Sequence, residues 1–255
     1  MPEGPEVFYM VRNLNKNYKD LILTELNILS GRYTKHGYPK NYEIFKKNLP
    51  SRIKKFHCKG KLIWIEFIEN LNILIILGYA HFTEEKDKNT PLEFITKKKK
   101  FYLKDIRHFA TINFLSNEEL HKKIKARGPS IVTNEMSETD FEIILKIQKE
   151  KKPENLIGSL LLDQYLISGI GNYIRADALY LSKLSPFTKI KDLKTKQIQN
   201  LFKSIKKVIN ESLKALSKNN LYDCLVYRKD MISGNKIQRD ELTGRSIYWV
   251  PEIQK

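Results

Sequence analysis

Cysteine is scarce in this sequence, and that scarcity argues against two common ways of stabilising a fold. The chain of 255 residues has two cysteines, Cys58 and Cys224, and neither has a second cysteine nearby. A disulfide framework and a four-ligand structural zinc site are therefore not expected. His57 adjoins Cys58, but neighbouring residues on a strand point to opposite faces and rarely share a metal. We interpret both cysteines as structural thiols.

Long apolar runs are lacking as well. The apolar stretch LNILIILGYA spans residues 71–80, whereas a helix needs about 20 apolar residues to cross a membrane. The first residues also lack the order of a secretion signal, in which charged residues precede an apolar run. We therefore expect a soluble, intracellular protein that has no membrane partner.

Acidic residues are few relative to basic ones. Lysine and arginine number 46 against 29 aspartates and glutamates, which gives a formal net charge of +17. Such an excess favours a polyanionic partner, and nucleic acid before an anionic membrane, because counterion release from phosphates supplies affinity that does not depend on sequence. Solubility is the alternative explanation, but it rarely requires so one-sided a balance.

The periodicity of the apolar residues changes near the middle of the chain. A helix is predicted to begin at Pro5, which suits a first helical turn. Ser137 and Asp140 have the spacing of a helix cap. Strand-like segments cover residues 21–29, 52–58, 61–67, 71–82, 94–103 and 110–115. Helical segments cover residues 137–150, 153–168 and 194–219. Residues 227–249 are predicted to form a hairpin with two glycine-containing turns.

These patterns predict an α+β fold in four parts, on a chain long enough for two domains. We expect a mainly β domain over residues 1–130, a linker over residues 131–136, a helical domain over residues 137–219 and a strand-like tail over residues 220–255.

The stretch LLLDQYLISGIGNYIRADALY, residues 160–180, is the most specific internal signal. An apolar helix is predicted to run into Gly169, Gly171 and Asn172, and a second helix to start at Tyr173. Glycines allow positive φ and close approach, while a helix N-terminus offers free N–H groups to an anion. The motif therefore indicates a phosphate clamp, although a lone G-x-G is as often a tight interhelix turn.

The opening PEGPEV and the GIGNYIRADALY turn together resemble the formamidopyrimidine-DNA glycosylase and endonuclease VIII family of base-excision repair enzymes, over nearly the whole chain. The resemblance implies an N-terminal β-sandwich domain with flanking helices and a C-terminal helical domain. The turn would belong to a helix-two-turn-helix element that grips DNA phosphates, with Asn172 as the phosphate-binding asparagine. Asp177 replaces a glutamate common in the family, and we expect it to be structural.

The tail TGRSIYWVPEIQ resembles the zincless finger of the endonuclease VIII-like branch, a metal-free hairpin in place of the four-cysteine zinc finger. Arg245, directly after Gly244, matches the finger arginine that contacts phosphate beside the lesion and assists catalysis. Taken alone, Arg245 would be read as a surface charge.

The N-terminus supplies the expected nucleophile. A glycosylase that also cuts the strand needs an amine to attack C1′ of the sugar. An α-amino group has a pKa of about 7.7 to 8, so its pKa needs far less lowering than that of lysine for the amine to be neutral. Removal of Met1 would expose the amine of Pro2. By resemblance Glu3 acts as acid and base on the opened sugar, and Glu6 lies near the lesion. A capped helix start is the structural alternative.

Other residues follow from the same resemblance. Lys61, directly after Gly60, matches the lysine that contacts phosphate and donates a proton to the departing group. Arg107 and Phe109 match a loop that fills the space left by the flipped base. Tyr79 stands where the family often has a methionine, so it either fills that space or packs inside the domain.

The function implied is a bifunctional DNA glycosylase and apurinic/apyrimidinic lyase that needs no cofactor or metal and acts as a monomer. Its partner would be damaged double-stranded DNA, with single-stranded DNA left open. The zincless tail favours oxidised pyrimidines and hydantoins over 8-oxoguanine. The alternative is a non-enzymatic nucleic-acid-binding protein that uses the helix-two-turn-helix, which would not require the PEGPE terminus or a Gly-Lys hairpin.

Overall fold

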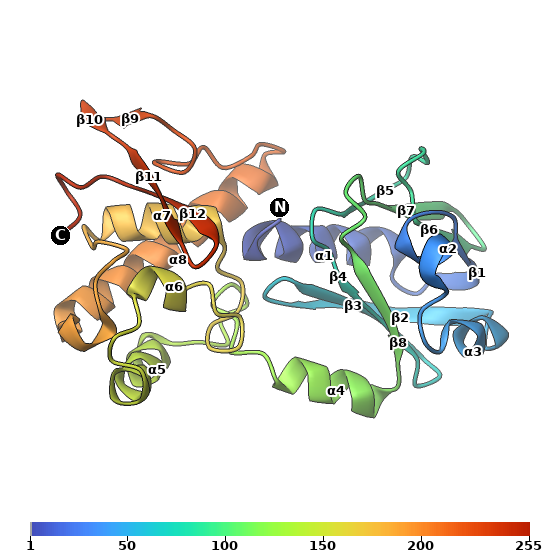
Figure 1. Ribbon diagram of the computed structural model, residues 1–255. Coiled ribbons are helices and arrows are strands. Elements are labelled where there is room, and N and C mark those ends of the chain that lie inside the picture. Colours follow the sequence, from blue (N-terminus) through green and yellow to red (C-terminus); the bar gives the residue numbers. More distant parts are fainter. Residues whose placement is uncertain (1) are drawn as a thin grey trace. The chain divides into compact units, whose positions relative to one another are not determined.

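The computed structural model describes residues 2–255 and has the predicted α+β composition (Figure 1). The chain forms two compact units. The first contains Pro2 and residues 7–126, and the second contains residues 3–6 and 127–255. Each unit is described by itself, and the four-part division made from the sequence stays a prediction.

The first unit is built on eight strands that pair in the order β5-β7-β6-β1-β2-β3-β4-β8, each antiparallel to its neighbour. The strands are β1 (Ile22–Ile28), β2 (Ser51–Lys59), β3 (Leu62–Phe67), β4 (Asn72–Ile76), β5 (His81–Thr83), β6 (Leu92–Thr96), β7 (Lys100–Lys104) and β8 (Thr111–Leu115).

Two halves of this sheet face one another, which confirms the predicted sandwich. Strands β1 and β2 are joined by two residue pairs, so the sheet can fold at that point. Phe56 of β2 and Phe101 of β7 have ring centroids 6.2 Å apart, and Phe101 stacks on Phe94 of β6 at 4.4 Å. Apolar residues of both halves therefore share one core, and Val7, Val11, Leu14 and Tyr18 of helix α1 (Gly4–Tyr18) join it.

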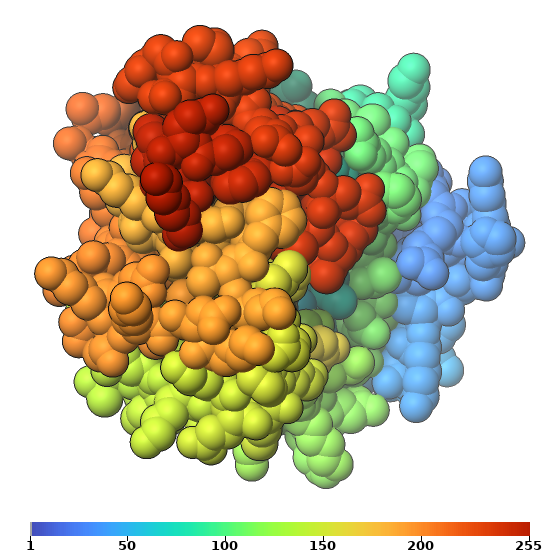
Figure 2. All heavy atoms as spheres, turned by 60° about the vertical axis from the view of Figure 1, so that its left-hand side comes forward, coloured from blue at the N-terminus to red at the C-terminus, as the bar shows by residue number. Residues whose placement is uncertain are grey.

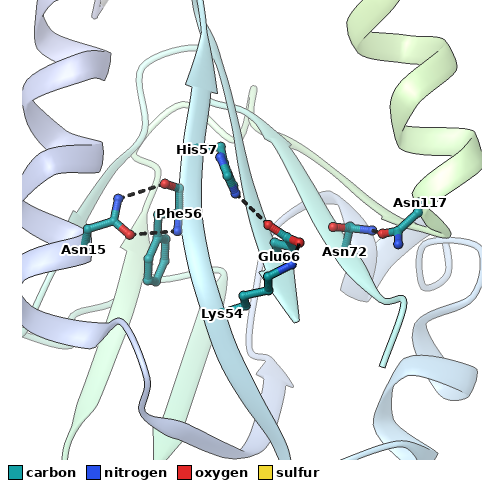
Figure 3. Close-up of polar contacts among 7 residues, drawn as sticks. All are labelled: Asn15, Lys54, Phe56, His57, Glu66, Asn72 and Asn117. Atoms are coloured by element: carbon teal, nitrogen blue, oxygen red, sulfur yellow. Dashed lines mark hydrogen bonds and ion pairs between the residues drawn. The ribbon is translucent and has the colours of Figure 1, made fainter. Parts of the chain in front are cut away.

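Polar side chains link helix α1 to β2, and β2 to β3, in this unit (Figure 3). The Asn15 amide pairs with both backbone groups of Phe56, donating to its carbonyl at 2.8 Å and accepting from its N–H at 3.0 Å. On the opposite face of β2 and β3, the His57 ring stacks on Trp64 with centroids 5.0 Å apart. Glu66 bonds His57 at 2.8 Å and Lys54 at 2.6 Å.

Two predicted strand segments are each divided by a turn. Residues 71–82 form β4 and β5 with a turn at Gly78, and residues 94–103 belong to β6 and β7. The Thr96 hydroxyl accepts from the N–H groups of Lys98 and Lys99, so it closes a turn that contains no glycine or proline. The short helices of this unit are α2 (Arg32–His36), α3 (Tyr42–Lys47) and α4 (Asn117–Lys125).

The second unit is helical with two hairpins. The cap predicted at Ser137 is confirmed, because its side chain accepts from Asp140 N–H and Asp140 accepts from Ser137 N–H. Within residues 2–255, none of the helices has the length and apolar content needed to cross a membrane. The elements are α5 (Glu138–Lys151), α6 (Ile157–Leu160), α7 (Asn172–Leu181), the 3-10 helix η1 (Ile190–Asp192), α8 (Thr195–Ser217), β9 (Met231–Ile232), β10 (Asn235–Lys236), β11 (Gln238–Leu242) and β12 (Arg245–Trp249).

The predicted apolar helix over residues 153–168 is wrong. Helix α6 ends at Leu160, and turns follow as far as Ser168. Side chains compete with the helix there: Asp163 accepts from Tyr165 N–H at 2.9 Å. The Gln164 amide donates to the Ile170 carbonyl at 2.8 Å and accepts from Gly169 N–H at 3.0 Å. Local side-chain bonds of this kind give the backbone an alternative to the helix.

The two C-terminal hairpins lie on the helices of their own unit, the red surface against amber and orange in Figure 2. Buried residues of the hairpins and of the segments that flank them form one cluster with Ala176 of α7: Val226, Ile237, Leu242, Ile247 and Val250. Trp249 donates from Nε1 to Asp240 at 2.6 Å and meets Phe187 edge to face at 5.3 Å. Apolar packing and this cross-strand bond hold the hairpin.

Candidate active site and nucleic-acid interface

Glu3 connects the two motifs that the sequence singled out. It lies directly before α1, is 5% exposed, and its carboxylate accepts from Tyr173 N–H at 3.0 Å and Ile174 N–H at 3.3 Å. Those N–H groups belong to the first turn of α7, where backbone donors have no partner within the helix. Residues 3–6 and the GIGN turn therefore form one local structure in the second unit.

The two glycines of GIGN have different reasons to be glycine. Gly169 has φ +103°, a conformation that residues with side chains rarely adopt, and its carbonyl accepts from Gly4 N–H at 2.9 Å. Gly171 has φ −127°, which other residues adopt readily. A Cβ at Gly171 would lie 2.0 Å from Cδ of Glu3, so here it is the close approach of Glu3 that excludes a side chain.

Glu6 is engaged in contacts that hold helices together. Its Oε2 accepts from Glu3 N–H at 2.9 Å, closing the first turn of α1. Its Oε1 accepts from the Tyr173 hydroxyl at 2.9 Å and the Ser212 hydroxyl at 3.3 Å. The pKa of Tyr173 is raised by burial and by the Glu6 and Glu3 carboxylates. A position for Glu6 near a lesion stays a prediction.

Arg175 is a residue of this site that sequence reasoning missed. It lies one helical turn after Asn172 and is fully buried. Its Nη2 donates to Asn172 Oδ1 at 3.3 Å and to the Ser246 carbonyl at 2.9 Å. Arg245 precedes Ser246 on β12, and its charge contributes to lowering the pKa of Arg175. Arg175 therefore bonds both the Asn172 side chain and the backbone next to Arg245. An arginine within an apolar helical run was the feature of the sequence that could have indicated it.

Asp177 has the structural role expected for it. It is fully buried, and its carboxylate accepts from three consecutive backbone N–H groups, those of Leu225, Val226 and Tyr227, at 2.6, 3.0 and 3.2 Å. Burial raises the pKa of Asp177, while these hydrogen bonds act in the opposite direction. The aspartate thus fixes the loop that leads from α8 into the hairpins.

The first unit contains the predicted amine and lysine. Lys61 is half-buried in the tight turn between β2 and β3, next to Gly60, and Lys59 pairs with Leu62 across that turn. Pro2 is half-buried. Met1, whose removal would free the Pro2 amine, lies outside the described residues.

In the first unit, the predicted void-filling residues Arg107 and Phe109 lie beside Tyr79, for which filling the void and packing inside the domain were both expected. The Arg107 guanidinium lies 4.2 Å from the centroid of the Tyr79 ring, and the rings of Tyr79 and Phe109 are 6.4 Å apart. Phe109 is 60% exposed. The buried Asp105 carboxylate accepts from Ala110 N–H at 2.7 Å and Arg107 N–H at 3.3 Å, which fixes the loop that carries them.

Neither cysteine lies in a cluster suited to a metal. Among residues 2–255, His, Cys, Asp and Glu side chains do not come together in threes in a way that could hold an ion. Burial and nearby carboxylates raise the pKa of Cys224 to about 12, so its thiol stays protonated at neutral pH. Both cysteines are half-buried.

Comparison with protein families matches both ends of the chain. The formamidopyrimidine-DNA glycosylase N-terminal domain matches residues 1–112, and the formamidopyrimidine-DNA glycosylase H2TH domain matches residues 132–220. A protein of Prochlorococcus marinus (strain MIT 9301) named formamidopyrimidine-DNA glycosylase is 28% identical over 296 residues, covering 100% of both chains. A protein of the same name from Desulforamulus reducens is 26% identical over 283 residues, covering 100% of this chain and 99% of that one.

Solved structures share the fold. The MutM (Fpg) protein of Thermus thermophilus is 20% identical with a TM-score of 0.83, covering 99% of this chain and 98% of that one. The Lactococcus lactis Fpg in complex with DNA containing an abasic site is 22% identical with a TM-score of 0.83, covering 99% of each chain. The chain belongs to the formamidopyrimidine-DNA glycosylase and endonuclease VIII family.

Proposed function

We propose that this member of a DNA glycosylase family excises oxidised bases and then cleaves the strand at the resulting abasic site, acting as a monomer through a Schiff base on Pro2. The observation that carries the proposal is the position of Glu3. Its buried carboxylate is fixed by two N–H groups of α7, and it is the peptide neighbour of the amine. A helix cap alone does not require an acid buried beside an amine.

Pro2 becomes a secondary amine when Met1 is removed. The nitrogen lone pair forms a bond to C1′ of the sugar while the damaged base leaves with its bonding electrons and takes up a proton. The sugar ring then opens, and an iminium ion joins Pro2 to C1′. Loss of a C2′ proton expels the 3′ phosphate, and a second elimination expels the 5′ phosphate, which leaves a one-nucleotide gap.

Glu3 transfers protons in these steps. The two N–H groups of α7 hold its carboxylate in place. In the proposed steps this carboxylate accepts a proton and returns it to the opened sugar. Because the carboxylate is already held in place, no side-chain ordering is needed during reaction.

The other predicted residues bind and distort the DNA. Asn172 and Arg245 contact phosphate, aided by the turn that Gly169 and Gly171 form, and Lys61 contacts phosphate and protonates the departing group. Arg107 and Phe109 fill the space left by the flipped nucleotide. Tyr79 supports Arg107, as the 4.2 Å contact between them suggests.

We propose oxidised pyrimidines and hydantoins as the preferred lesions. The support is the resemblance of the tail to a zincless finger, together with the absence of cysteine from residues 225–255. Formamidopyrimidine purines are the second candidate, because the relatives described above carry that name. Excision measured on duplexes that each contain one lesion would decide between them; preference for the purine lesions would overturn our assignment.

Borohydride reduction tests the mechanism directly. The processed protein should become covalently linked to abasic-site DNA, because reduction converts the iminium into a stable amine. A variant that retains Met1 should bind the same DNA without being trapped, and Pro2→Gly should retain part of the trapping since it keeps an amine. Binding without trapping by the correctly processed protein would support the non-enzymatic alternative.

Salt dependence tests the DNA-binding part separately. Several phosphate contacts by a chain of net charge +17 should make affinity fall steeply with salt. Affinity for DNA that does not change with salt would contradict the proposed phosphate contacts, whatever the outcome of trapping.

A further inference from the structure

Arg175 is buried completely, although removing a guanidinium from water is costly unless hydrogen bonds compensate. Its exposed fraction is 0%. Burial lowers the pKa of Arg175 to about 10, and the Glu3 carboxylate acts in the opposite direction. The side chain therefore remains a cation at neutral pH inside the helical unit.

Its hydrogen bonds reach Asn172 in its own helix and two elements that are separate in the sequence, α6 and β12. Nη1 donates to the Gly158 carbonyl in α6 at 3.1 Å, and Nη2 donates to Asn172 Oδ1 and to the Ser246 carbonyl in β12. Within the described residues, Arg175 Nε has no hydrogen-bond partner. A flat, forked guanidinium can serve these acceptors together, which the single ammonium of lysine would not reproduce.

The contact with Asn172 determines which way its amide faces. Arginine has donors and no acceptor, so the amide oxygen of Asn172 must point toward Arg175. The amide nitrogen, which can donate only, then points away. The amide nitrogen carries two N–H donors. An acceptor-rich group such as a phosphate is the ligand that this donor fits.

The contact with Ser246 fixes the start of β12. Arg245 follows the turn at Thr243 and Gly244, both with positive φ, and directly precedes Ser246. A bond to the Ser246 carbonyl therefore restrains the backbone from which the exposed Arg245 side chain extends.

We propose that Arg175 is a positioning residue, a proposal that rests on the proposed function. Arg175 holds the amide N–H groups of Asn172 and the backbone of Arg245 at a fixed separation, so that both residues bind the DNA backbone together. Arg175 itself does not contact DNA in this proposal. It acts through the two residues that it joins.

Binding of duplex DNA with an abasic-site analogue tests this role. Arg175→Lys keeps the charge but not the fork, and should weaken binding by roughly tenfold or more, given the usual cost of losing hydrogen bonds to a charged group. Arg239→Lys is the matched control, because Arg239 is exposed and bonds the Ser246 side chain rather than its backbone. The control should bind within about twofold of the parent protein.

A double-mutant cycle separates positioning from general structural support. In an Asn172→Ala, Arg245→Ala background, Arg175→Lys should cost little further affinity, because the residues it acts through are gone. An equal loss in both backgrounds, or parent-like binding by Arg175→Lys, would overturn the proposal. Thermal unfolding of each variant shows whether it is folded.

The cycle also distinguishes failure of this inference from failure of the proposed function. It measures binding and not trapping. If the parent protein is never trapped by borohydride but the cycle is non-additive, the positioning role is supported while the proposed catalysis is rejected. If the parent is trapped and the cycle is additive, the catalysis is supported and the role of Arg175 is rejected.

Discussion

The two units hold side chains of the proposed site in different ways. In the second unit, Glu3 and Arg175 are buried and hydrogen-bonded to backbone groups. In the first unit, Arg107 and Phe109 are exposed and their loop is fixed instead by the buried Asp105. The difference matches two proposed needs, since a proton-transferring or positioning group must be held in one place and a void-filling group must be free to enter DNA. Substitutions at the buried residues of the second unit should therefore affect both stability and DNA processing, and substitutions in the exposed loop of the first unit should affect DNA processing alone.

Gly171→Ala should have the largest effect. The added Cβ would lie 2.0 Å from Cδ of Glu3, so either the carboxylate or the start of α7 must move. Overpacking at a buried site of this kind costs about 3 kcal/mol. We expect the free energy of unfolding, measured with denaturant, to fall by about that amount, and trapping on abasic-site DNA to be largely lost.

Gly234→Ala is the control for the glycine substitution. Gly234 has φ +79°, and nothing lies within 4 Å of an added Cβ. Strain in the backbone should cost about 1 kcal/mol, and trapping should be unchanged. A Gly171 variant as stable and active as the Gly234 variant would show that the contact between Glu3 and the GIGN turn is not needed.

Phe109→Ala should show the reverse pattern. Because Phe109 is 60% exposed, its loss should change the free energy of unfolding by less than about 0.5 kcal/mol. Loss of an aromatic stacking contact with bases should reduce excision from duplex DNA by roughly tenfold. Single-stranded DNA has no opposite strand and no base stack to be held open, so excision from it should change less.

Ile106→Ala is the control on the same loop, since Ile106 is 63% exposed but was not predicted to enter DNA. It should match the parent protein on duplex substrate. Equal losses for Ile106→Ala and Phe109→Ala would mean that the loop as a whole, and not the aromatic ring, determines the activity.

Substitution of Tyr79 should reduce excision less than substitution of Phe109, and the reduction should depend on loss of the aromatic ring. The contact with Arg107 is worth about 0.5 to 1 kcal/mol at an exposed site. Tyr79→Phe keeps that contact and should excise bases from duplex DNA like the parent. Tyr79→Leu should lose roughly threefold, and loss by both variants would point to the hydroxyl instead.

The sequence predicted elements best where amphipathic periodicity decides the structure. The helix over residues 194–219 corresponds to α8, and the cap at Ser137 is present, because both depend on neighbours along the chain. The segment 153–168 was mispredicted because Asp163 and Gln164 bond nearby backbone groups. Apolar composition alone does not reveal that competition.

The site was predictable as a list of residues but not as a set of contacts. Glu3 and Gly171 are 168 positions apart in the sequence, and Glu3 and Ile174, which are hydrogen-bonded, are 171 positions apart. No local pattern indicates that these residues touch. The glycines were expected to allow positive φ and close approach; the φ of Gly171 is ordinary, and the close approach is that of Glu3. Arg175 was missed because two of its three acceptors, the carbonyls of Gly158 and Ser246, come from distant segments.

His57 should give the smallest effect, on a face that carries none of the predicted site residues. Burial lowers the pKa of His57, helped by Lys55 and Lys54, while Glu66 acts in the opposite direction. Between that lowered pKa and the ordinary value of about 6.5, the folded protein binds fewer protons than the unfolded chain. Stability should therefore rise with pH through this window and be fully present above it.

His57→Gln removes this contribution while keeping a polar side chain on Trp64. The parent protein should lose more stability than the variant when the pH falls from about 7.5 to about 5, a range that spans the ordinary histidine pKa, measured by denaturant unfolding at each pH. Both should excise bases equally at the higher pH. If the stabilities of the parent and the variant depend equally on pH, then the pKa of His57 is the same in the folded and the unfolded chain. A loss of excision would instead extend the functional region onto the outer face of β2 and β3, and the contrast between the two units would then no longer separate stability from activity.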